Sequence, residues 1–147
     1  MLKVYDDAYF MRQALIQARL AATMGEIPVG AVVVASGRII ARGHNETERL
    51  NDVTAHAEII ALTAAANHLG DKYLLDCTLY VTLEPCPMCA GALHWAQTSR
   101  IVYGASDDKR GFMRFGRELL HPRTKLEFGI LHDECAELMT EFFQRRR

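Results

Sequence analysis

The chain has 147 residues, 50% of them hydrophobic and 24% charged, and its formal net charge is −1. This length predicts one domain with its own buried core, and the near-neutral charge gives no general case for nucleic-acid binding. No apolar run approaches the length of a membrane span, and the first residues, MLKVYDDAYF, contain no hydrophobic signal region. We therefore expect a cytoplasmic protein that has no membrane partner.

The first half of the chain alternates helical and extended patterns. Apolar residues at helical spacing predict a helix over 6–24. VGAVVVA (29–35) and IIARGHN (39–45) predict two strands joined by a tight SGR turn. An Ala-rich helix follows and should end at Gly70, with Asp52 or Thr54 as its N-cap.

The second half continues this alternation. CTLYVTL (77–83) predicts a strand, and Pro85 is expected as the first residue of a helix that runs to about Gln97. Further segments are a strand at 100–104, a loop over 105–117 with a short helical piece near 117–120, a strand at 125–130 and a final amphipathic helix from 133. Together these predict a three-layer α/β/α domain around one mixed central sheet of about five strands.

Two cysteines stand three residues apart in EPCPMCAG. Cys77 and Cys135 form no second pair of this kind, which excludes a four-cysteine zinc knuckle and suggests that both lie in the core. In the first turn of a helix, Cys86 and Cys89 would share one face, and the helix dipole would favour their thiolates. The pair suits one zinc ion, although a redox dithiol or a coincidence is also compatible with the spacing.

A histidine should supply the third ligand. His56 is singled out because TAHAEII places Glu58 two residues after it, at the start of the other central helix. In a first turn both side chains can lean over the helix end, one toward a metal and one toward its water. Three protein ligands leave a fourth position for water, which is the mark of a catalytic zinc.

The order and spacing of these residues resemble those of a known protein family. HAE followed about 30 residues later by PCPMC resembles the H-x-E…P-C-x-x-C signature of zinc-dependent nucleobase deaminases. Resemblance to the bacterial tRNA-specific adenosine deaminases covers nearly the whole chain, through EIPVGAVVV, GHN, TAHAEIIAL, TLYVTLEPCPMCAGA, RIVYGASDDKRG and GILHDECAELMTEFF. The chain departs from this family at HWAQTSRI and at Arg110–Phe115, where a run of small residues is usual.

The resemblance implies a cytidine-deaminase-like fold over residues 1–147 with one Zn²⁺ per chain. It implies His56, Cys86 and Cys89 as the zinc ligands and Glu58 as the residue that moves protons during hydrolytic deamination. The implied reaction converts adenosine to inosine at the wobble position of a tRNA anticodon. The implied partners are a tRNA anticodon stem-loop and a second copy of the chain, with the cysteine-bearing helix near the interface.

Substrate contacts are expected in two basic segments. Residues 105–125 carry a local net charge of +3, and the chain ends on Arg145, Arg146 and Arg147; two solvated faces are the alternative interpretation. By resemblance, Asn45 holds the nucleoside, a turn-forming role being the alternative. We expect Asp107, Lys109, Phe143 and Arg146 to gather at the pocket mouth, where cations hold phosphates, an aromatic ring stacks a base and Asp107 accepts hydrogen bonds or holds its loop.

Two alternatives remain open from the sequence. A free-base or nucleoside deaminase acting on guanine or cytosine shares the zinc signature, and PCPMC…HWA also resembles guanine deaminases. A non-catalytic zinc module is the other alternative, but it needs a fourth protein ligand and has no use for Glu58. The sequence does not specify which tRNA is the substrate.

Overall fold

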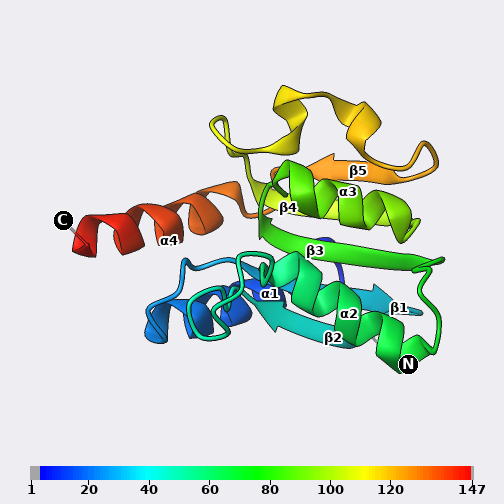
Figure 1. Ribbon diagram of the computed structural model, residues 1–147, viewed down its shortest axis with the longest axis horizontal. Coiled ribbons are helices and arrows are strands. Elements are labelled where there is room, and N and C mark those ends of the chain that lie inside the picture. Colours follow the sequence, from blue (N-terminus) through cyan, green and yellow to red (C-terminus); the bar gives the residue numbers. More distant parts are fainter. Residues whose placement is uncertain (1–3, 147) are drawn as a thin grey trace.

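The computed structural model describes residues 4–146, so Arg147 of the predicted basic tail lies outside the described residues. Within 4–146, four α-helices and two short 3-10 helices accompany a five-stranded sheet of order β2-β1-β3-β4-β5 (Figure 1). The elements are α1 Asp7–Thr23, β1 Gly30–Ala35, β2 Arg38–His44, α2 Ala57–Leu69, β3 Cys77–Leu83, α3 Pro87–Trp95, β4 Arg100–Ala105, η1 Phe112–Arg114, η2 Arg117–Leu119, β5 Lys125–Phe128 and α4 His132–Arg145.

The sheet is mixed, as predicted. Strands β1 and β2 form the expected antiparallel hairpin, and its turn residues Ser36 and Gly37 both have positive φ, as this tight turn requires. Strand β3 pairs antiparallel with β1, whereas β4 and β5 continue the sheet in parallel. The carboxyl ends of β3 and β4 therefore meet at one edge of the sheet, where the loops that follow them come together.

Helices cover both faces of the sheet, which confirms the three-layer architecture. Residues of α2 and α3 share one buried cluster with the sheet, and residues of α1 and α4 share the other. Figure 1 shows α2 and α3 in front of the strands. Cys77 and Cys135 are buried in these two clusters, as expected. None of the helices in residues 4–146 has the length and apolar character needed to cross a membrane.

A glycine in β2 sets how closely α2 approaches the sheet. A Cβ atom at Gly43 would lie 2.7 Å from the carbonyl oxygen of Ala57 and 2.8 Å from the backbone nitrogen of Ala61. Any larger residue would push the first turns of α2 away from the strand. The close contact fixes the end of α2 that carries His56 and Glu58.

The predicted start of α2 is wrong. Its N-cap is His56, which has no side-chain capping hydrogen bond. The carboxylate of Asp52 instead accepts hydrogen bonds from the backbone nitrogen and hydroxyl of Thr54, at 2.8 and 2.7 Å. Because these two residues close a local turn, neither of them can cap the helix.

The predicted start of α3 is also wrong. Pro85 lies outside the helix, Cys86 is the N-cap with φ −74° and ψ 168°, and Pro87 opens the helix. A residue that precedes proline is disfavoured in the helical region, so Cys86 must stay extended. The missing N–H of Pro87 costs nothing at the first helical position, so the proline that opens the helix is Pro87 rather than Pro85.

Candidate active site

The starts of two helices bring the predicted zinc ligands together. The Nδ1 atom of His56 lies 3.7 Å from Sγ of Cys86 and 3.5 Å from Sγ of Cys89. The three ligand atoms all lie within 4.8 Å of one another. Tetrahedral zinc, with Zn–N near 2.0 Å and Zn–S near 2.3 Å, places a nitrogen and a sulfur ligand about 3.5 Å apart. The donor set and its spacing therefore fit zinc.

The two thiols are electrostatically different. A hydrogen bond from Cys89, helped by His56, lowers the pKa of Cys86 to about 4 despite its partial burial. The hydrogen bond with Cys86, followed by burial, raises the pKa of Cys89 well above its usual range. These opposite shifts arise because one thiol donates its proton to the other sulfur. A cation that displaces this proton would meet two thiolates, the form in which cysteine binds zinc.

Glu58 is a buried carboxyl beside the ligands but outside the ligand group. It occupies the first turn of α2, and 4% of its surface is exposed. Burial raises the pKa of Glu58 to about 7, and a cation bound next to it would lower that value. A carboxyl that exchanges its proton near neutral pH is suited to general acid–base catalysis.

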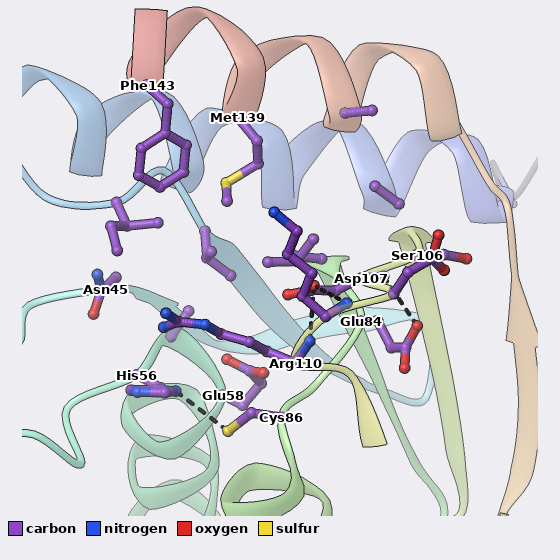
Figure 2. Close-up of a pocket in the computed structure, with 18 of the residues that line it drawn as sticks. Asn45, His56, Glu58, Glu84, Cys86, Ser106, Asp107, Arg110, Met139 and Phe143 are labelled. Carbon is purple, nitrogen blue, oxygen red and sulfur yellow. Dashed lines mark hydrogen bonds between the residues drawn. The ribbon is translucent and has the colours of Figure 1, made fainter. Parts of the chain in front are cut away.

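His56, Glu58 and Cys86 form the floor of a cavity of about 840 Å³, and Cys89 is buried beneath it. Figure 2 shows His56, Glu58 and Cys86 on one side of this pocket and Met139 and Phe143 of α4 on the opposite side. Asn45, Asp107, Lys109 and Phe143 all line the pocket, whereas Arg146 does not. The structure thus brings together every predicted substrate residue except Arg146.

Asn45 directly follows β2 and is buried at the side of the pocket. Its side-chain oxygen accepts a hydrogen bond from the backbone nitrogen of Thr47 at 3.3 Å, and its own backbone nitrogen donates to the carbonyl of Val29 at 3.1 Å. The turn-forming role is therefore present in the structure. The same position leaves the side chain at the pocket wall, so its substrate role stays a prediction.

Asp107 organises the loop after β4. Its Oδ1 accepts hydrogen bonds from the backbone nitrogens of Lys109 and Arg110, at 3.2 and 3.1 Å. The side chain of Arg110 extends across the pocket, above Glu58 and toward Asn45 (Figure 2). One carboxylate thus fixes the backbone of two cationic residues that face the pocket.

Other cations of the basic segment are engaged elsewhere. The guanidinium of Arg114 donates to the carbonyl of Lys109, and that of Arg117 donates to the carbonyl of Thr124. Arg123 donates to the side-chain oxygen of Gln97 at 3.3 Å. The local charge of +3 therefore overstates the positive charge that the pocket receives.

The two phenylalanines of α4 face different surroundings. Phe143 is 46% exposed and lines the pocket. The guanidinium of Arg146 lies 4.5 Å from the ring centre of Phe142 and donates to the carbonyl of Gly25, at the junction of α1 and α4. Arg146 therefore points away from the zinc ligands, and a contact with RNA from this place stays a prediction.

Glu84 is a pocket residue to which the sequence analysis assigned no role. It is 6% exposed and lies between β3 and the two cysteines predicted to bind zinc. The available signal was a charged residue directly after a strand with no charged residue, two positions before a predicted metal ligand. Its partners lie more than 20 residues away in the sequence, so periodicity and spacing alone could not identify them.

Comparison with known proteins agrees with this geometry. Residues 4–105 match the model of the cytidine and deoxycytidylate deaminase zinc-binding region. The tRNA-specific adenosine deaminase of Agrobacterium fabrum is 44% identical over 97% of both chains. The chain belongs to the tRNA-specific adenosine deaminase family. It thus falls within the wider group of zinc-dependent nucleobase deaminases to which the signature pointed.

Solved structures resemble this family member along most of its length. One solved structure comes from a study of A-to-I editing by tRNA:A34 deaminases at the wobble position. It matches this chain with a TM-score of 0.83 and 43% identity, and the match covers 88% of this chain and 98% of that one. The guanine deaminase of Nitrosomonas europaea has a TM-score of 0.81 and 27% identity, covering 95% and 86%. Deaminases with different substrates therefore share this fold, so the fold alone does not identify the substrate.

Proposed function

We propose that this protein converts adenosine to inosine at the wobble position of a tRNA anticodon, using one zinc ion per chain. The observation that carries the proposal is the buried carboxyl of Glu58 beside the His-Cys-Cys group, in a pocket with Lys109, Arg110 and Phe143 on its walls. Three ligands leave a position for water, which favours an enzyme over a structural zinc module.

Glu58 is the residue that moves protons in this proposal. Zinc, when bound to the His-Cys-Cys group, supplies a water molecule whose pKa is lowered to about 7. The Glu58 carboxylate takes a proton from the attacking water as a bond forms between the water oxygen and C6 of adenine. Glu58 gives this proton to the adjacent ring nitrogen, then takes the second water proton from the new hydroxyl group on C6 and gives it to the amine. The C6–N bond breaks, ammonia leaves and inosine remains.

The remaining pocket residues would hold the anticodon. Lys109 and Arg110 are placed to bind phosphates, and Phe143 offers an aromatic face for an unstacked base. Asn45, at the pocket wall, would bind the nucleoside, and Asp107 would act through the loop that it organises. The target base must leave the loop stack, which costs a few kcal/mol and less in a single-stranded loop than in a duplex.

The decisive experiment is incubation with total bacterial tRNA, followed by detection of inosine at the wobble position. Parallel reactions with free guanine and free cytosine test the alternative substrates, and the Glu58→Ala variant controls for contaminating deaminases. We expect inosine in tRNA and no change in the free bases. Conversion of guanine with no inosine in tRNA would identify the protein as a free-base deaminase instead.

Phe143→Ala is expected to weaken binding of an anticodon stem-loop by about tenfold, because stacking of one base on an aromatic ring is worth about 1–3 kcal/mol. The matched control is Phe142→Ala, which removes the same ring from the surface between α1 and α4. We expect it to change the dissociation constant by less than about twofold. Fluorescence anisotropy of a labelled stem-loop measures both variants, and equal losses would show that the tail acts through packing.

Truncation after Glu141 removes both rings and the basic tail. We expect weaker tRNA binding and a shallower salt dependence, since each lost phosphate contact lowers the slope by about one. Zinc content should be unchanged. A truncated protein that binds and deaminates tRNA as well as the full chain would place the RNA elsewhere.

A homodimer is expected through α3. Met88 and Trp95 are 40% and 79% exposed, lie two turns apart on one face of α3, and flank the half-buried Gly91 and Ala92. A Cβ atom added at Gly91 would meet nothing within 4 Å, so this stripe has room for a partner. A helix that buries one face in its own domain and exposes an apolar second face suits a self-complementary interface.

Light scattering should therefore give twice the 16.5 kDa mass of one chain at micromolar concentration. Trp95→Glu should lower the mass to that of a monomer, because it places a charge in an apolar interface. Leu20→Glu on α1, where the side chain is 45% exposed on the other face of the sheet, is the control. A wild-type monomer, or equal effects of both substitutions, would contradict an interface at α3.

A further inference from the structure

Glu84 is a buried carboxylate with no part in the proposed chemistry. It lies two residues before Cys86 and faces the loop after β4 rather than the zinc ligands (Figure 2). A buried carboxylate is costly unless hydrogen bonds compensate for the lost water. The groups that donate hydrogen bonds to Glu84 therefore indicate its role.

Those partners are two backbone N–H groups at opposite ends of one loop. Oε1 accepts a hydrogen bond from the backbone nitrogen of Asp107, and Oε2 accepts one from the backbone nitrogen of Met113, each at 3.1 Å. A Cβ atom at Gly111 would lie 1.8 Å from Oε2, so the loop backbone closes directly on the carboxylate. Glycine is required there by this contact.

The clamped segment carries the cations of the pocket. Lys109 and Arg110 lie between the two bonded N–H groups, and both line the pocket. Their backbone nitrogens donate to the side chain of Asp107, whose own backbone nitrogen donates to Glu84. A short chain of hydrogen bonds thus connects the buried carboxylate to the two residues placed to meet phosphates.

We propose that Glu84 is a positioning residue for RNA binding, because it holds the 107–113 loop in the conformation that directs Lys109 and Arg110 into the pocket. This inference rests on the proposed function. Phe112 is fully buried and its backbone nitrogen donates to the carbonyl of Pro85 at 2.9 Å. That anchor stays when Glu84 is changed, so the loop loses its geometry rather than its attachment.

Glu84→Gln keeps the size of the side chain but replaces one accepting oxygen with an NH₂ group that faces an N–H donor. In a Glu58→Ala background, which prevents turnover, we expect the dissociation constant for an anticodon stem-loop to rise about tenfold. The matched control is Thr124→Val, which removes a buried hydrogen bond to the carbonyl of Thr98, outside the pocket. It should change binding by less than about twofold, and zinc should stay bound in both variants.

Two further measurements separate positioning from a general loss of stability. The effect of Lys109→Ala should be clearly smaller in the Glu84→Gln protein than in the parent, since both changes remove the same contact. Amide hydrogen exchange at Asp107 or Met113 should accelerate in Glu84→Gln but not in Thr124→Val. Additive effects, equal losses in the two variants, or unchanged exchange would each overturn the proposal.

The exchange measurement also separates this inference from the proposed function. If the wild-type protein does not bind the stem-loop, the assignment of the substrate is wrong. Exchange rates then still decide whether Glu84 holds the loop, because they need no ligand. If exchange accelerates while a wild-type-like affinity for RNA remains, Glu84 holds the loop without positioning it for RNA, and the proposal is wrong.

Discussion

Replacing Glu58 with alanine is expected to lower turnover of tRNA by about 10³-fold or more, with little change in the affinity for tRNA. A positioned acid–base group typically contributes about 10²–10⁴-fold, and Glu58 is proposed to act in both proton transfers. It lies outside the three-residue ligand group, so zinc should stay bound at the wild-type level. Single-turnover kinetics, together with metal analysis of the same protein, provide the measurement.

Glu58→Gln is the matched variant for this experiment, because it keeps the shape of the side chain and cannot accept the proton. Both substitutions should abolish turnover to a similar extent. A glutamine variant that retains more than about a tenth of the wild-type rate would show that another group moves the proton. Loss of zinc in either variant would instead make Glu58 part of the metal site.

The same carboxyl should make the stability of metal-free protein depend on pH. Burial raises the pKa of Glu58 to about 7, so the folded chain keeps this proton to a higher pH than the unfolded chain, whose pKa is about 4.3. The stability that Glu58 contributes is therefore fully present below about pH 4 and is lost as pH rises toward 7. After chelator treatment, the melting temperature of Glu58→Ala relative to wild type should increase between pH 4 and pH 8.

Elements with strong periodicity were predictable from the sequence, whereas the starts of the two catalytic helices were not. The rule that Ser, Thr, Asp or Asn caps a helix favoured Asp52 or Thr54, but His56 holds that position without a capping hydrogen bond. Cys86 likewise occupies an N-cap position that Pro87 enforces. In both cases a predicted metal ligand stands where a capping residue would stabilise the helix. Local rules fail most readily at such functional positions.

The loop after β4 shows a different limit of sequence reasoning. Composition predicted a charged loop, and the resemblance predicted substrate contacts from Asp107 and Lys109. Which cations face the pocket depends on hydrogen bonds to groups that composition does not identify. Arg114 and Arg117 bind backbone carbonyls, while Glu84, from the end of β3, fixes the segment that carries Arg110. Contacts between residues so far apart in the chain cannot be derived from composition or spacing.

Cys89→Ser is expected to leave well under one equivalent of zinc per chain and to abolish deamination at the same time. Cys89 is fully buried and joins the start of α3 to His56 at the start of α2. A serine hydroxyl does not ionise near neutral pH, so it cannot replace the thiolate ligand. Two remaining ligands hold zinc far more weakly than three, and Cys86→Ser should behave in the same way.

The matched control is Cys135→Ser, which makes the same chemical change in the other buried cluster. It should lower the stability by about 1–3 kcal/mol, the cost of a buried hydroxyl without a partner, and keep zinc and activity. A chelator should lower the melting temperature of wild type and of Cys135→Ser but not that of Cys89→Ser, because bound zinc stabilises only a protein that can bind it. Retention of a full equivalent of zinc by Cys89→Ser, or iron in the wild-type protein, would contradict the proposed His-Cys-Cys zinc site.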